Sequence, residues 1–172
     1  MYKKVFTLLF LLSSFQFLIA QTSLLKNFPE GYTPDEIGRR IAYRFVTEKH
    51  ALHAGKWIGY PETFYWNGSL KYAAAAKDKA LIKLLQARFE HLFTTEKALL
   101  PIKNHVDLNM FGSLPLELYW VTKDERYKEL GLPYADTQWE VPADAKPAEK
   151  EWAEKGYSWQ TLLWIDDMYM IT

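Results

Sequence analysis

Residues 68–78 read GSLKYAAAAKD and residues 112–124 read GSLPLELYWVTKD, so the same Gly-Ser-Leu opening recurs after 44 positions. A Lys-Asp pair follows each opening, nine residues after the first glycine and eleven residues after the second. A repeat of this length suits a helical hairpin, because two short helices and their turns fit within it. The repeat therefore predicts that the chain is built from successive helix pairs.

Helix signals continue on both sides of the repeat. Thr33 is a suitable N-cap, Pro34 suits the first turn and two acids follow, so a first helix is expected from there through residue 53. A break over residues 55–61 should end it. The further expected helices span residues 63–76, 79–93 and 107–122, a segment that starts at 123–124, and 159–172.

The expected helices leave two longer loops, at residues 94–104 and 140–155, the second with room for one helical turn. Six helices in three hairpins, with no convincing strand, predict an all-α array. In such an array alternate helices face inward, here the second, fourth and sixth. Trp66, Asp107 and Asp166 would then lie near the starts of the inner helices.

Composition sets limits on the possible partners. The 172 residues are 49% hydrophobic and 16% aromatic, which is enough apolar material for a packed core. Lysine plus arginine and aspartate plus glutamate number 21 each, so net charge gives no reason to expect a nucleic acid or an anionic membrane as partner. The chain has no cysteine, which excludes disulfides and thiolate metal sites.

Glu48, His50 and His53 superficially resemble a metal-binding set. The two histidines are three residues apart at a helix end, and no convincing third ligand accompanies them, so surface positions are the simpler interpretation. We therefore expect neither a metal nor another cofactor.

Residues 1–20 have the pattern of a secretory signal peptide. Lys3 and Lys4 precede two apolar runs, 5–12 and 15–19, and Ala20 offers a cleavage point. The alternative is a membrane anchor, but Ser13, Ser14 and Gln16 interrupt the apolar stretch, which is short for a membrane span. We expect cleavage without stable membrane insertion, and an exported protein, periplasmic or secreted, that consists of residues 21–172.

The last stretch, residues 156–172, reads GYSWQTLLWIDDMYMIT and places Asp166 and Asp167 in apolar surroundings. A carboxylate in such a place costs several kcal/mol of desolvation unless it is paired, hydrogen-bonded or protonated, a setting that suits a general acid. On a helix, consecutive residues stand about 100° apart, so only one acid would point into a narrow pocket and the other would support it. The alternative is that the pair caps a helix.

Four segments carry a resemblance to a known family: WIGYPETFYWNGSL (57–70), NHVDLNMFGSLPLELY (104–119), GLPYADTQWEVP (131–142) and SWQTLLWIDDMYM (158–170). They resemble the unsaturated glucuronyl and unsaturated rhamnogalacturonyl hydrolases, glycoside hydrolase families 88 and 105. The resemblance implies an (α/α)6 barrel of six hairpins. This chain would be its N-terminal half, because no helix-stop signal follows residue 159. Such a half ring is expected to expose apolar inner faces, and so to be inactive and poorly soluble alone.

The resemblance also implies a substrate and a chemistry. These enzymes remove a 4,5-unsaturated uronic acid from the non-reducing end of an oligosaccharide by hydrating its enol-ether double bond. By motif, Asp166 matches the catalytic acid and base, and Asp107 matches the carboxylate that binds substrate hydroxyls. Trp66 matches an aromatic residue that stacks on the sugar. His105 and Trp159 are weaker matches to substrate-binding residues.

Each site has a structural alternative. Trp66 is also expected of a core, Asp107 of an N-cap, and Trp152, Trp159 and Trp164 of ordinary packing. Two other functions remain open from the sequence: a non-catalytic helical glycan-binding or scaffold protein, and another (α/α)6 carbohydrate-active enzyme.

Overall fold

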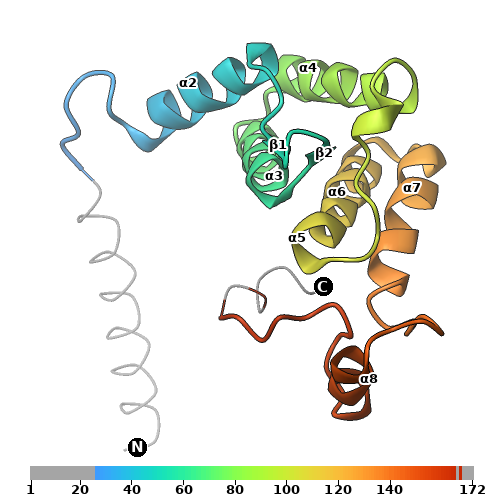
Figure 1. Ribbon diagram of the computed structural model, residues 1–172. Coiled ribbons are helices and arrows are strands. Elements are labelled where there is room, and N and C mark those ends of the chain that lie inside the picture. The colour runs from blue at the N-terminus through green and yellow to red at the C-terminus, as the bar shows by residue number, and fades with distance from the viewer. Residues whose placement is uncertain (1–25, 166, 168–172) are drawn as a thin grey trace, which may run out of the picture. The chain divides into compact units, whose positions relative to one another are not determined.

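A computed structural model describes residues 26–165 and residue 167 (Figure 1). The predicted signal peptide, Asp166 and residues 168–172 lie outside the described residues. The described chain divides between Ile37 and Gly38 into two parts, which are treated separately below.

The first part ends in the start of helix α2 (Pro34–Thr47), and its capping confirms the prediction for Thr33. The Thr33 hydroxyl accepts a hydrogen bond from the Glu36 amide at 3.2 Å, and the Glu36 carboxylate accepts one from the Thr33 amide at 3.0 Å. This reciprocal pair satisfies two donors that the helix start leaves free. The prediction for the other end is wrong, since α2 stops at Thr47 and not at residue 53.

A short β-hairpin replaces the predicted end of the first helix. Strands β1 (Leu52–His53) and β2 (Trp57–Ile58) pair antiparallel, with Leu52 opposite Ile58 and His53 opposite Trp57. Ala54 and Gly55 have positive φ angles of 51° and 68°, which reverse the chain between the strands. The expectation of no strand is therefore wrong at this one place.

The two copies of the repeat form equivalent helix–turn–helix units. Helices α3 (Tyr60–Ala75) and α4 (Lys79–Glu90) make the first, and α6 (Ser113–Thr122) and α7 (Glu125–Asp136) make the second. Each Lys-Asp pair has the same role: Lys77 and Lys123 have positive φ angles of 56° and 63°, and each aspartate caps the next helix. Each repeat thus contains a right-handed helix that is followed by one lysine in the left-handed backbone conformation and then by the aspartate that caps the next helix.

Other boundaries shift by a few residues. Helix α3 begins before the predicted residue 63, because Pro61 fits the first turn of a helix. Short 3-10 helices η1 (His91–Phe93) and η2 (Lys97–Leu99) follow α4. The predicted helix at 107–122 is divided into α5 (Val106–Asn109), η3 (Met110–Gly112) and α6.

The C-terminal part departs most from expectation. Helix α8 (Pro147–Glu154) lies within the stretch predicted as a long loop. Residues 159–165, predicted as helix, form turns and extended chain instead, and Leu163 has a positive φ of 57°. Side-chain hydrogen bonds to distant carbonyl groups hold this stretch, so tertiary contacts override its helical pattern.

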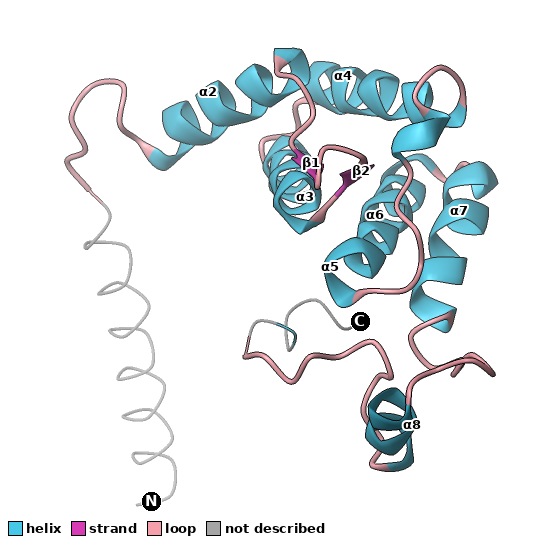
Figure 2. Ribbon diagram, in the orientation of Figure 1, coloured by secondary structure: helices cyan, strands magenta, loops and turns pink. Residues whose placement is uncertain are grey.

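The helices of the second part pack as predicted for successive hairpins. Helix α3 contacts α4, α6 contacts α7, and α3 contacts α6, so the two hairpins lie against each other through α3 and α6 (Figure 2). Their shared core is rich in fully buried aromatic side chains: Phe45, Trp66, Phe89, Phe111 and Tyr127. The all-α fold class is thereby confirmed. None of the described helices combines the length and apolar character that a bilayer crossing requires.

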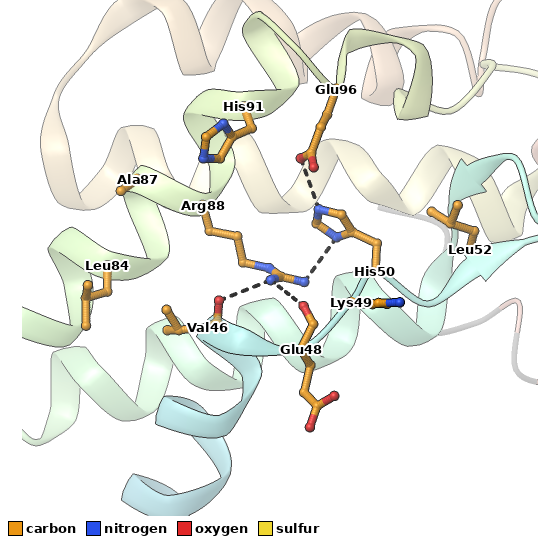
Figure 3. A pocket seen from close by; sticks show the side chains of 10 residues that line it. All are labelled: Val46, Glu48, Lys49, His50, Leu52, Leu84, Ala87, Arg88, His91 and Glu96. Carbon is orange, nitrogen blue, oxygen red and sulfur yellow. Dashed lines mark hydrogen bonds and ion pairs between the residues drawn. The ribbon is translucent and has the colours of Figure 1, made fainter.

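An ionic network beside this core involves Arg88, His50, Glu62 and Glu96, and Figure 3 shows its bonds among Arg88, His50, Glu96 and the carbonyl groups of Val46 and Glu48. The Arg88 side chain of α4 donates to the Val46 and Glu48 carbonyl oxygens at 3.2 and 2.7 Å, and to the Glu62 carboxylate of α3 at 3.1 Å. His50 lies between two acids, with Nδ1 2.6 Å from Glu62 and Nε2 3.2 Å from Glu96. The network therefore fixes the chain between α2 and β1 to both helices of the first hairpin.

Glu62 is the centre of this network and is only 2% exposed. Burial by itself raises its pKa, but hydrogen bonds from His50, the Ala51 amide and Arg88 outweigh it and hold the pKa below the ordinary value of 4.5. A lowered pKa in the folded state means that the ionised form stabilises the fold above about pH 4.5, and that this contribution disappears as the pH falls through the lower value.

We expect Glu62→Gln to lower the free energy of unfolding at pH 7 by about 3–5 kcal/mol, because it leaves Arg88 buried without its carboxylate. The variant should also lose less stability than the wild type between pH 5 and about pH 3. Chemical denaturation across this pH range measures both effects. The control is Glu48→Gln, since the Glu48 carboxylate pairs with Arg44 in solvent and should matter little. Equal pH dependence of Glu62→Gln and wild type would contradict the assignment.

The contact between α6 and α7 depends on two glycines. A Cβ atom on Gly131 would lie 2.7 Å from Leu116 Cγ and 3.0 Å from the Gly112 carbonyl oxygen. Gly131→Ala should therefore destabilise the protein by about 1–3 kcal/mol through overpacking. The control is Gly68→Ala, at the first-repeat counterpart of Gly112, where a Cβ meets no atom within 4 Å. Thermal unfolding should show a lower Tm for Gly131→Ala and an unchanged or higher Tm for Gly68→Ala.

Candidate functional site

A cleft of about 520 Å³ lies where the β-hairpin, the start of α5, α8 and the C-terminal stretch meet. Its walls carry three indole and two imidazole rings together with amide and charged side chains. The aromatic and imidazole residues are Trp57, Trp152, Trp159, His53 and His105. Large aromatic surfaces with a few polar groups are typical of small-ligand sites.

The β-hairpin supplies His53 and Trp57, which lie opposite each other in its register. The Ala51 amide donates to the Glu62 carboxylate at 3.1 Å, so the buried network holds the first strand in place. Trp57 was not predicted as a site residue, although it opens one of the four segments that carry the family resemblance. The sequence feature that could have identified it is its position directly after Gly55 and Lys56, which are typical of a turn.

His105 and Asp107 lie together at the start of α5. His105 is the N-cap, because its Nδ1 accepts a hydrogen bond from the Asp107 amide at 3.2 Å. That bond requires an unprotonated Nδ1, which leaves the ring hydrogen on Nε2. Asp107 Oδ2 is 3.8 Å from His105 Nδ1, and the Asp107 side chain is 15% exposed. The N-cap alternative for Asp107 is therefore wrong, and its carboxylate is not used for capping.

Trp159 and its neighbours form another wall of the cleft. The Trp159 indole Nε1 donates to the Thr137 carbonyl oxygen at 2.7 Å, and the Ser158 hydroxyl donates to that of Gln138 at 3.0 Å. The Gln160 amide donates to the Lys103 carbonyl oxygen at 3.2 Å. These three bonds fix the wall to the chain directly after α7 and to the chain before α5.

Asp167 is placed by the structure, and Asp166 lies outside the described residues. The Asp167 side chain is 2% exposed, and its Oδ2 accepts three hydrogen bonds from residues 161, 162 and 164. This arrangement agrees with a supporting role for one acid of the pair. It does not test the catalytic role predicted for Asp166.

Trp66 does not share the cleft with His105 and Trp159. Its side chain has no exposed surface and packs against Phe45 and Phe89, with the Arg88 guanidinium 5.4 Å from the centre of its ring. A sugar could not stack on this indole without opening the core. The structure gives Trp66 a packing role, and the stacking role stays a prediction.

A second cavity, of about 620 Å³, lies beside the ionic network (Figure 3). It contains Glu48 and His50, two of the residues weighed above as metal ligands, while His53 lies in the cleft. Glu48 pairs with Arg44, and His50 is held between Glu62 and Glu96. Within residues 26–165 and 167, no group of three potential ligands is arranged to hold a metal ion.

Comparison with known proteins gives one match. A family model described as Glycosyl Hydrolase Family 88 matches residues 35–172, which include the hairpins, the cleft and both aspartates of the last stretch. No curated protein and no solved structure matches the chain. The family has a six-hairpin fold, with which the paired helices described above agree, and it acts on oligosaccharides. The chain therefore belongs to glycosyl hydrolase family 88, a family of glycoside hydrolases.

Proposed function

We propose that the cleft binds an oligosaccharide with a 4,5-unsaturated uronic acid at its non-reducing end, and that the enzyme releases this residue by hydration. The observation that carries the proposal is the juxtaposition of three indole rings with His105 and the adjacent carboxylate of Asp107, in a chain of this family. The apolar face of a sugar ring packs well against an indole. The polar residues of the cleft suit its hydroxyl groups.

The reaction would begin at the double bond between C4 and C5. Asp166, protonated, gives its proton to C4, and a water molecule adds its hydroxyl to C5 while the same carboxylate takes the remaining proton. The product is a hemiketal at C5, which opens to a ketone and leaves a hemiacetal at C1. Collapse of that hemiacetal releases the remaining sugar. One positioned acid and base of this kind contributes about 10²–10⁴-fold to the rate.

Asp107 would bind the substrate and not exchange protons with it. Its carboxylate is partly exposed next to the cleft-lining His105 and can accept hydrogen bonds from sugar hydroxyl groups. The separation rule that relates two carboxylates to retention or inversion does not apply, because the reacting carbons are C4 and C5 and not the anomeric carbon.

The first test follows the absorbance of the unsaturated uronide in lyase-generated pectic and glycosaminoglycan oligosaccharides, with protein expressed from its complete coding sequence. The wild type should consume the band, Asp166→Asn should abolish turnover, and Asp107→Asn should mainly raise KM. Product analysis for the released keto acid confirms hydration.

Persistence of the band with every substrate, from a folded wild-type protein, would overturn the proposal. Oligosaccharide binding without turnover would then favour a glycan-binding or scaffold protein. Consumption of saturated oligosaccharides would instead favour another reaction on the same fold.

The second test concerns the walls of the cleft. Trp57→Ala should raise KM with a smaller effect on kcat, because it removes a stacking surface and leaves both aspartates in place. The control is Trp120→Ala, since Trp120 is 72% exposed and lies outside the cleft. Steady-state kinetics on the best substrate of the panel separates the two variants. Equal effects of both would show that the cleft is not where the sugar binds.

A further inference from the structure

One oxygen of Asp167 collects three hydrogen bonds from the preceding turn. Its Oδ2 accepts from the Thr161 hydroxyl at 2.7 Å, from the Leu162 amide at 2.7 Å and from the Trp164 amide at 3.2 Å. The Asp167 amide in return donates to the Trp164 carbonyl oxygen at 3.1 Å. Four bonds thus close a compact loop over residues 161–167.

The Thr161 hydroxyl extends this arrangement. It donates to Asp167 and accepts from the Leu163 amide at 3.0 Å, so it connects the carboxylate to a third backbone amide. Leu163 has a positive φ of 57°, a conformation that a branched apolar residue rarely adopts without support. The side chains of Asp167 and Thr161 are 2% and 5% exposed, so these bonds are shielded from water and are charge-assisted.

The loop is also a wall of the cleft. Thr161 and Leu162 line the cleft beside Trp159 and Gln160, which are tied to distant carbonyl groups. The apolar side chains of the loop contribute little to its shape, since those of residues 162–165 are between 41% and 83% exposed. The hydrogen bonds to Asp167 and Thr161 therefore determine the path of the backbone here.

We infer that Asp167 is a positioning residue, which acts with Thr161 to hold the cleft wall and the backbone that leads to Asp166. This inference rests on the proposed function for its effect on turnover. Its Oδ2 accepts three hydrogen bonds, while Oδ1 is buried without a partner among the described residues, so the role assigned to Asp167 rests on the bonds that hold the loop. A displacement of about 1 Å in such a wall can cost about 10² in rate.

The test compares three variants of the full-length enzyme. Asp167→Ala removes the acceptor, Thr161→Val removes the hydroxyl at nearly constant shape, and Thr161→Ser restores the hydroxyl in a smaller side chain. We expect kcat/KM to fall about 10²-fold in the first two and to stay near the wild-type value in the third. A role in packing alone predicts the opposite order at residue 161, with valine tolerated better than serine.

Amide hydrogen exchange provides a readout that does not depend on activity. The amides of Leu162 and Trp164 should exchange faster in Asp167→Ala, and that of Leu163 should do so in Thr161→Val. Unchanged exchange, or full activity of Thr161→Val in an active wild-type background, would overturn the inference. An inactive wild type would count against the proposed function alone, and the exchange experiment would still decide whether Asp167 holds the wall. Should Asp167→Ala not fold, the two Thr161 variants carry the same test.

Discussion

The ion pair between Glu62 and Arg88 is the interaction on which the first hairpin and the cleft both depend. Two buried charges lose their hydration. Hydrogen bonds to nearly every donor and acceptor of the two side chains offset this loss. Those partners include one backbone group in the last turn of α2 and two between α2 and β1. The same pair that ties α3 to α4 therefore also sets where the β-hairpin begins, and so where Trp57 lies in the cleft.

Much of the helical architecture could be predicted from the sequence, because its signals are local. The two Lys-Asp pairs are the clearest case. A lysine with a positive φ angle and an aspartate that caps the next helix need no distant partner. The β-hairpin and the stretch after Ser158 could not be predicted in this way. Bonds from Ser158, Trp159 and Gln160 reach carbonyl groups 20 or more positions away, and periodicity carries no information about them.

The candidate site was predictable to the same extent. His105 and Trp159 line one cleft and Asp107 lies next to His105, while the roles that the motifs imply for them stay predictions. Trp66 shows the limit of such reasoning, because a tryptophan on a buried helical face and one that binds sugar have the same spacing in the sequence. Trp57 reaches the cleft through the turn at Ala54 and Gly55, where the sequence predicted a break between helices and no β-hairpin.

The two adjacent aspartates, Asp166 and Asp167, were predicted to have different roles, one in the chemistry and one in support. The helix predicted over residues 159–172 would place the two acids about 100° apart, but residues 161–165 of that stretch are not helical. Hydrogen bonding supports the proposed division of roles, since the buried Asp167 carboxylate accepts from the Thr161 hydroxyl and two backbone amides. The negative charge of the Asp167 carboxylate strengthens its three hydrogen bonds and so stabilises the loop. Protonation of this carboxylate during catalysis would weaken these bonds at each turnover. Holding the loop is the role inferred for Asp167, and proton transfer is the role proposed for Asp166.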